Sequence, residues 1–293
     1  MEDAYQNYIV ALEICRQVGD IARQSNILNN LGAIFYRKAL YHKSLEYYLE
    51  GYELDRLLGN LPGQAAKLSN MAIMASSLGR YPEALEKFSL ALKIERQTGS
   101  LEGQMRKLGN IASLFGLMGE KEQALACIEE ALALAEKIGS RGYLAFGLGM
   151  RASFLAGLGR LDEAEGNALA ALALAEECGN LSLVADNCRY VTEIYLAKDL
   201  FDKALEYSTR AVMTVESNQL FEANQELIYF YHYQALTKVG RQAEAWDSLD
   251  KAYRIVDSKL NNMPQEVDRQ ELINKNEPYR KIREEWKRIR EGG

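Results

Sequence analysis

Three asparagines that recur at one spacing are the residues of this chain best suited to hold another molecule. Asn30, Asn70 and Asn110 follow one another at intervals of 40 residues. A side-chain amide donates and accepts hydrogen bonds, so one asparagine can satisfy both the N–H and the C=O of a bound peptide unit. Each asparagine could also bond only to a neighbouring helix of its own chain, and the sequence leaves both readings open.

Further polar side chains accompany the asparagines. Three glutamines repeat with the same spacing, at Gln24, Gln64 and Gln104. Other polar or small residues close by are Asn26, Asn29, Ser69, Arg106 and Ser113. Because a guanidinium group binds carboxylates through paired hydrogen bonds, Arg106 and, farther along the chain, Arg189 are candidates for pairing with an acidic group of a partner.

The chain lacks the usual sequence marks of an enzyme. It contains no Gly-Lys-Ser/Thr phosphate loop, no His-Glu-x-x-His motif and no nucleophile elbow. Only two histidines are present, His42 and His232, in different repeats, so we expect neither a histidine metal site nor a catalytic triad. Residues 147–152 match a dinucleotide-binding fingerprint, but no strand is expected before them. Their glycines should instead thin a helix for packing or open a groove, and we expect no catalytic residue, metal or cofactor.

Composition and charge exclude several kinds of partner and location. The net charge of −6 argues against general nucleic-acid binding, which needs a basic surface. No apolar run approaches the roughly 18–20 residues that cross a bilayer, and the acidic start at residues 1–5 is unlike a signal peptide. The cysteines show neither disulfide nor metal-ligand spacing, which favours a reducing, cytoplasmic location. They are Cys15, Cys127, Cys178 and Cys188.

The elements that position these residues repeat every 40 residues. Leu-Gly-Arg-Tyr-Pro-Glu-Ala-Leu at 78–85 returns in related form at 118–125 and 158–165, with weaker copies at 40–45 and 200–205. A fixed period of this length indicates a solenoid, in which each repeat packs only on its neighbours.

Two breaks divide each repeat into two antiparallel helices. Glycine followed by Asp, Asn or Ser recurs from Gly19 to Gly179, where the glycine can end one helix and the polar residue can cap the next. A second break falls at Gly79, Gly119, Gly159 and, with one inserted residue, Gly240. We expect first helices near 21–38, 61–78, 101–118, 141–158, 181–198 and 221–238. Their partners should lie near 41–58, 81–98, 121–138, 161–178, 201–217 and 242–259.

These motifs resemble the tetratricopeptide repeat over about residues 5–260. The resemblance rests on Leu31-Gly32, Met71-Ala72, the Gly-x-x-x-Glu-Ala-Leu turn at 79–85, and Ala91. The period is longer than the common 34 residues and is similar to the repeats of kinesin light chain and of bacterial regulator-type domains. The resemblance implies an all-α fold, a right-handed α-solenoid (superhelix) of antiparallel helix pairs. The fifth and sixth repeats match poorly, with Asp199 at a glycine position and a bulky Tyr190.

The resemblance also implies where a partner binds. In tetratricopeptide proteins the first helices line a concave groove, and asparagine at this position often bonds the main chain of an extended peptide. Glu193 should face the same groove. The expected peptide- or partner-binding residues are Asn26, Asn30, Asn70, Arg106, Asn110, Phe146, Met150, Arg189 and Tyr190.

Two functions therefore stand in order of preference. The first is a protein–protein interaction scaffold that binds a peptide segment or a protein domain in its concave groove. The alternative is a ligand-sensing regulatory domain of a larger multidomain signalling or transcription regulator. Neither involves nucleic acid or a membrane span.

The two ends of the chain depart from the repeat. Residues 1–20 match the second helix of a repeat whose first helix is absent, so we expect a truncated first repeat, an introduced or internal start at Met1, and possible self-association through the exposed repeat end. Residues 21–260 should hold six repeats. Residues 261–293 should form a linker, marked by Asn261, Asn262 and Pro264, and then a C-terminal helix.

That C-terminal helix has two readings. Tyr279, Ile282, Trp286 and Ile289 form an apolar stripe between basic residues. It could cap the last repeat or act as a basic amphipathic helix for a membrane surface or a partner. An aromatic cluster in the sixth repeat has a similar ambiguity, because it could pack against the terminal helix or form a pocket. Its members are Tyr229, Phe230, Tyr231 and Tyr233.

Overall fold

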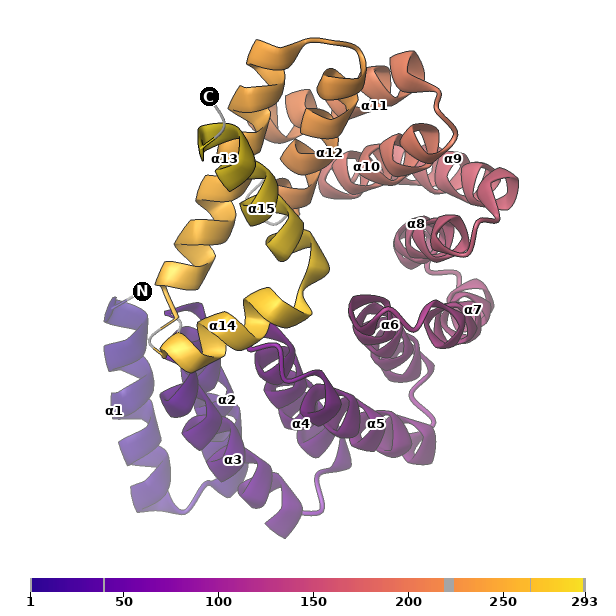
Figure 1. Ribbon diagram of the computed structural model, residues 1–293. Coiled ribbons are helices and arrows are strands. Elements are labelled where there is room, and N and C mark those ends of the chain that lie inside the picture. The colour runs from indigo at the N-terminus through magenta and orange to yellow at the C-terminus, as the bar shows by residue number, and fades with distance from the viewer. Residues whose placement is uncertain (1, 39, 219–223, 264, 292–293) are drawn as a thin grey trace. The chain divides into compact units, whose positions relative to one another are not determined.

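The computed structural model describes residues 2–38, 40–218, 224–263 and 265–291, and across these ranges the regular structure is α-helical throughout (Figure 1). The predicted all-α solenoid class is confirmed. Met1 and Pro264, to which we assigned an introduced start and part of a linker, lie outside the described residues. The helices are α1 Glu2–Val18, α2 Ile21–Arg37, α3 Tyr41–Leu57, α4 Leu61–Ser77, α5 Tyr81–Thr98, α6 Leu101–Met118, α7 Lys121–Ile138, α8 Arg141–Gly157, α9 Leu161–Glu177, α10 Leu181–Ala197, α11 Phe201–Asn218, α12 Gln225–Lys238, α13 Gln242–Asn261, α14 Glu266–Lys275 and α15 Glu277–Glu291.

The glycine breaks end the helices as their chemistry predicts. Gly59 has φ +66°, a left-handed conformation that costs glycine little. Asn60 then caps α4, because its side-chain oxygen accepts a hydrogen bond from the Gly63 backbone N–H at 3.2 Å. Asp20 and Asn180 cap α2 and α10 in the same way. The observed helices therefore follow the predicted ranges, although residues 221–223 of the expected 221–238 helix are not described and α12 begins at Gln225.

The mid-repeat break of the fifth repeat has aspartate at the position that Gly79, Gly119 and Gly159 occupy in other repeats. Asp199 has φ +55° and is the one non-glycine residue with positive φ within the described ranges. Aspartate is among the few side chains that enter this region at modest cost. The turn of the fifth repeat is thus preserved despite its poor match to the motif.

The chain divides into two compact units, which we describe separately. Unit 1 comprises Met1–Leu114 and Asn261–Lys275, which includes α1 to α5, most of α6, and α14. Unit 2 comprises Phe115–Leu260 and Asn276–Gly293, which includes the end of α6, α7 to α13, and α15.

Unit 1 packs its helix pairs through a close approach at a glycine. A Cβ atom at Gly32 would lie 2.5 Å from the ring of Tyr48, so α2 and α3 can cross here only without a side chain on α2. On the other side of α2, Leu28 and Leu31 are fully buried against Leu12 of α1. The outer face of α1 remains exposed.

Unit 2 buries alanines where α7, α8 and α9 pack. Ala124, Ala164 and Ala168 are fully buried, and Ile128 and Leu155 fill the space around them. These contacts hold α7, α8 and α9 together as a stack of alternating first and second helices.

The C-terminal segment forms two helices, of which the sequence predicted one. In unit 2, Ile282 of α15 is fully buried, and Trp286 stacks on Tyr253 of α13 at 3.9 Å between ring centroids. In unit 1, α14 occupies Glu266–Lys275. The predicted linker is wrong in extent, since Asn261 ends α13 and a helix follows soon after. The reason is that α14 buries only Asp268 and Leu272, too few residues to form an apolar stripe.

Candidate functional site

The three recurring asparagines of unit 1 differ in their hydrogen bonds. Asn70 on α4 donates from Nδ2 to Oδ1 of Asn29 on α2 at 2.8 Å. Within the described residues, the side-chain amides of Asn30 and Asn110 have no hydrogen-bond partner. Asn30 is exposed and Asn110 is half-buried. One asparagine therefore joins neighbouring helices, while two keep a donor and an acceptor available.

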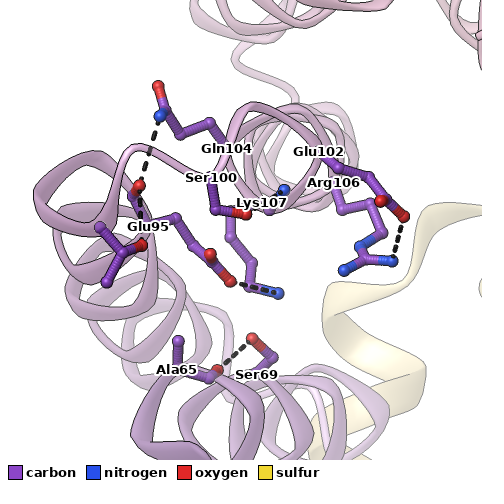
Figure 2. A network of polar contacts seen from close by, with 10 residues as sticks. Ala65, Ser69, Glu95, Ser100, Glu102, Gln104, Arg106 and Lys107 are labelled. Atoms are coloured by element: carbon purple, nitrogen blue, oxygen red, sulfur yellow. Dashed lines mark hydrogen bonds and ion pairs between the residues drawn. The ribbon is translucent and has the colours of Figure 1, made fainter. Parts of the chain in front are cut away.

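The recurring glutamines have a structural role. Nε2 of Gln104 donates to the backbone C=O of Glu95, at 3.3 Å, near the end of α5 (Figure 2). Gln24 and Gln64 make the same bond to the carbonyls of Cys15 and Asp55. Each of these carbonyls also accepts a backbone N–H in the turn that ends the helix, so the glutamine adds a second hydrogen bond near the helix C-terminus. Each glutamine comes five residues after the glycine that ends the preceding helix, and this short offset, which the asparagines lack, would have separated the two sets.

A cavity of about 190 Å³ opens beside Asn110 between α4, α5 and α6. It is lined by Ile73, Ser76, Ser77, Phe88, Asn110, Ser113 and Leu114. The apolar side chains provide a floor, while one amide and three hydroxyls provide polar contacts. This cavity is suited to one side chain of a bound segment. Ser113 could be identified from the sequence, whereas Ser76 and Ser77 could not, because neither belongs to a periodic set.

Arg106 lies one helical turn before Asn110 and points to an exposed carboxylate (Figure 2). Its Nη1 donates to Oε1 of Glu102 at 2.8 Å, and the two side chains are 57% and 66% exposed. An exposed pair four residues apart on a helix contributes little stability, about 0.3–0.5 kcal/mol. A carboxylate of a partner could therefore replace Glu102 at small cost in free energy.

Another predicted site residue of unit 1, Asn26 on α2, is also exposed.

Among the predicted site residues of unit 2, two offer a partner little surface. Met150 and Arg189 are only 6% and 5% exposed, whereas Phe146 is exposed beside Tyr143. The guanidinium of Arg189 lies 3.8 Å from the ring centroid of Tyr190. Arg189 is thus a buried cation that makes a cation–π contact with Tyr190, and it is not available at the surface.

Two carboxylates balance the charge of Arg189. Asp186 and Glu193 lie 3.8 Å and 3.7 Å from its nitrogens. The Oγ of Ser153 donates to the carboxylate of Glu193 at 3.1 Å. Burial raises the pKa of Glu193, although Arg189 and Ser153 oppose that shift. Sequence reasoning placed Arg189 on the groove surface because it considered this charge without its neighbours.

The glycines of the dinucleotide-like stretch thin α8 for packing. A Cβ atom at Gly149 would lie 2.2 Å from Oδ1 of Asn187 and 2.8 Å from the Tyr190 ring. At Gly147 it would lie 2.7 Å from Cδ2 of Leu132. The stretch lies inside a helix, so these glycines admit neighbouring side chains and do not cradle a phosphate.

Unit 2 also contains a larger cleft of about 550 Å³ between α10, α12 and α15. Phe230 and Tyr233 of the aromatic cluster stack at 5.9 Å, and the Tyr233 hydroxyl donates to Glu285 of α15 at 2.9 Å. The cluster therefore does both things predicted of it, since it contacts the terminal helix and lines a cleft. The full lining is Leu196, Phe230, Tyr233, Gln234, Thr237, Lys238, Lys281, Glu284, Glu285 and Arg288.

The two histidines belong to different units and have different partners. His42 contacts Gln265, whereas Nδ1 of His232 shares a hydrogen bond of 2.9 Å with Oγ of Ser208. Within the described ranges, no cluster of three or more His, Cys, Asp and Glu side chains could hold a metal ion. The four cysteines are free. No described helix has both the length and the apolar character needed to cross a membrane.

The comparisons with known proteins agree with this architecture. Residues 63–137 match the family model for the tetratricopeptide repeat. No curated protein sequence matches the chain.

Solved structures share the fold at low identity. A Rap protein complexed with Competence and Sporulation Factor has a TM-score of 0.65 and 14% identity, over 97% of this chain and 85% of that one. A putative kinesin light chain from Podosopora anserina, with nearly identical TPR-like repeats, has a TM-score of 0.53 and 15% identity, over 66% and 95%. A STAND signal transduction ATPase from Pyrococcus horikoshii, with a tetratricopeptide repeat sensor, has a TM-score of 0.68 and 15% identity, over 90% and 42%.

Proposed function

We propose that this tetratricopeptide-repeat protein is an interaction scaffold that holds an extended segment of another protein along the first helices of unit 1. The observation that carries the proposal is the pair Asn30 and Asn110, whose side-chain amides have no partner within the described residues. They come from α2 and α6 and keep both a donor and an acceptor for a peptide main chain.

The surroundings of Asn110 suggest what kind of segment binds. Its cavity of about 190 Å³ would take one side chain, and Arg106 would pair with a carboxylate. We therefore expect an extended segment with an acidic residue near the side chain that enters the cavity. The fold shared with a Rap protein solved in complex with Competence and Sporulation Factor supports a role in binding another molecule.

The other predicted site residues have different roles in this proposal. Asn26 is exposed in unit 1 and remains a candidate contact of this segment, while Phe146 is exposed in unit 2 and remains a candidate contact of that unit. Asn70 already bonds Asn29, and we assign it the spacing of α2 and α4. Tyr190 is half-buried beneath Arg189 and would support that cation rather than meet a partner.

A selection experiment tests the scaffold. Twelve-residue peptides would be selected from a random display library against the whole chain, and their dissociation constants measured by calorimetry. Replacing both amides, N30A with N110A, should raise the dissociation constant about tenfold, since each lost hydrogen bond contributes about 0.5–1.5 kcal/mol. The exposed Asn7 on α1 provides the matched control, N7A.

Two results would contradict the scaffold proposal. One is unchanged affinity in N30A/N110A with an unchanged melting temperature. The other is an affinity that depends on Phe146 of unit 2 and not on the amides of unit 1.

A second function, sensing of a small ligand, is favoured by the cleft of about 550 Å³ in unit 2. Its volume suits a small molecule, with an aromatic floor of Phe230 and Tyr233 and cations at Lys238 and Lys281. The tetratricopeptide sensor of the Pyrococcus horikoshii ATPase has the same fold. A thermal-shift screen of sugars, nucleotides and short peptides tests it: a stabilising compound should lose its effect in F230A and keep it in N110A.

The other sequence-based expectations stand as parts of the proposal. We propose that the chain acts by binding rather than catalysis, in the cytoplasm and without nucleic acid. We retain the division into a truncated repeat at 1–20, six repeats at 21–260 and a C-terminal segment at 261–293. Self-association through α1 is supported by its exposed Val10, Ile14 and Val18.

A further inference from the structure

In unit 1, a helix from late in the sequence occupies a surface formed by early residues (Figure 1). Nη2 of Arg80, in the turn between α4 and α5, donates to Oδ1 of Asp268 on α14 at 2.8 Å. The Asp268 side chain is only 6% exposed, while that of Arg80 is 39% exposed. His42, at the start of α3, contacts Gln265 just before α14. The contact therefore joins a buried acid to a basic turn.

Gly79 shows that this turn is shaped for a helix backbone. A Cβ atom at Gly79 would lie 3.1 Å from Cα and 3.2 Å from N of Leu272 on α14. The glycines in the same position of the next two repeats, Gly119 and Gly159, have nothing within 4 Å. All three glycines serve the turn through positive φ, but only Gly79 also admits another segment of the chain.

Two apolar side chains of the same C-terminal stretch are buried. Leu272 and Met263 are buried, at 7% and 2% exposure. The space left beneath Asp268 is a cavity of only about 20 Å³, lined by Tyr41, His42, Leu45, Met74, Leu78, Arg80 and Asp268. Helix α14 therefore fills almost all of the space above these residues. We call the part formed by Tyr41, His42, Met74, Leu78, Gly79 and Arg80 the turn surface.

Few residues attach α14 to the turn surface, fewer than we would expect for a helix that belongs permanently to a core. The helix has 10 residues, fewer than the 12–15 at which an isolated helix becomes even marginally stable in water. It buries only Asp268 and Leu272, four residues apart on one face, whereas Val267 is 74% exposed. Such a segment binds mainly because the chain tethers it nearby, so a competing helix can replace it.

We propose that the turn surface is a second interaction site, which takes a partner's helix carrying Asp and Leu four residues apart, and that α14 occupies it in the absence of that partner. The acid pairs with Arg80 and the leucine packs beside Gly79. This site differs from the amide site, since Asn30 and Arg106 stay exposed while α14 is in place. It does not depend on the proposed scaffold function.

A peptide added in trans tests the proposal with the whole chain. The probe is a fluorescent peptide of residues 262–276, and the receptor is the chain with D268K and L272A, which places a second cation beside Arg80 and releases α14. The peptide should bind this variant at least tenfold more tightly than it binds the wild-type chain. A peptide with D268N and L272A should bind at least tenfold more weakly.

A pair of matched arginine substitutions tests whether the peptide binds to the turn surface. R80A in the released chain should weaken peptide binding about tenfold. R160A changes the same repeat position in unit 2, where the arginine pairs locally with Glu163, and should have no effect. If D268K/L272A fails to melt cooperatively, the single change D268N serves as receptor, with a smaller gain in affinity.

Two outcomes would overturn the proposal. The first is a folded, released chain that binds the native and the doubly changed peptide equally. The second is a wild-type chain that forms a dimer which the free peptide dissociates, since this would assign the turn surface to α14 of a second copy rather than to a different partner.

Discussion

The two units solve one packing problem in different ways. Where α3 meets α4, unit 1 buries an ion pair: Asp55 and Lys67 lie 2.7 Å apart and are 1% and 3% exposed. One repeat later, Glu95 and Lys107 take the same positions at 3.8 Å (Figure 2). Where α1 meets α2, however, the uncharged Cys15 and Ile27 take these positions. In unit 2 the corresponding positions hold no charge.

The corresponding residues of unit 2 fill the space with hydrocarbon or with an amide. Ala135 and Gly147 replace the pair in one repeat, and the side chain of Leu132 lies against Gly147. In the next repeat, Ala175 faces Asn187, whose Nδ2 donates at 3.3 Å to the backbone carbonyls of both Ala145 and Ala171. An amide can therefore bridge the helices without charge.

The difference teaches that the repeat motif fixes the backbone but not the chemistry of each junction. Burial lowers the pKa of Lys107, while Glu95 opposes that shift, so burial disfavours the charged form that the ion pair needs. A buried ion pair is weak evidence for stability, because desolvation can exceed the attraction. The pair matters most when one partner is removed and the other is left alone.

Breaking the pair in unit 1 should have the largest effect. K67M leaves Asp55 buried without its cation and should lower the free energy of unfolding by about 3–5 kcal/mol. Chemical denaturation measures this. D55L/K67M, which imitates the uncharged junctions of unit 2, should recover most of the loss, and the exposed control K93M should change little. A double variant no better than K67M would show that the two junctions are not interchangeable.

Acid should lower the stability of the fold through His232, which is half-buried in unit 2 and uncharged at neutral pH. Burial, with a smaller effect from Arg241, lowers the pKa of His232 from 6.5 to about 4. As the pH falls from 6.5 to 4, the unfolded chain gains a proton that the folded chain refuses, so about 3 kcal/mol of stability is lost across that interval and is fully present above it. Denaturation of wild type and H232Q at pH 7 and pH 4.5 measures this. Equal losses in both proteins would remove His232 from the account.

Removing the amide bridge of unit 2 should have an intermediate effect. N187A leaves two buried carbonyls without their extra donor and should cost about 1–3 kcal/mol. The exposed Asn167, which bonds only a carbonyl of its own helix, provides the control N167A. Thermal melting distinguishes the two. If both variants melt like wild type, the bridge does not take the place of the ion pair.

The glutamine bond of unit 1 should contribute least. Q104L replaces a side chain that bonds the Glu95 carbonyl with the leucine that unit 2 carries at position 144. The expected loss is no more than about 1 kcal/mol, because the Glu95 carbonyl still accepts the backbone N–H of Ser100 at 3.0 Å. A loss as large as that of K67M would place the energetic difference between the units in these glutamines.

The helices could be predicted from the sequence because one local rule repeats. A glycine with positive φ ends most of the helices, and at Asp20, Asn60 and Asn180 the next residue caps the following helix, without reference to the rest of the chain. The helix α14 escaped prediction because it has no stripe of its own, and its two buried residues depend on Arg80 and Gly79 far away in the sequence. Tertiary contacts of that kind leave no periodic pattern.

The candidate site was predictable only in part, for a similar reason. Residue type and spacing identified the asparagines, but could not show that Asn70 bonds Asn29 while Asn30 does not. Arg189 fits a binding role by its type, yet Glu193 and Tyr190 enclose it. The availability of a polar group depends on neighbours that the sequence does not place.

The most direct test of the scaffold is nuclear magnetic resonance of the side-chain amides. On addition of a peptide selected against the whole chain, the ¹⁵N–¹H signals of the Asn30 and Asn110 side chains should shift, while that of the buried Asn187 stays in place. Shifts confined to unit 2, with the Asn30 and Asn110 signals unmoved at saturation, would contradict the account.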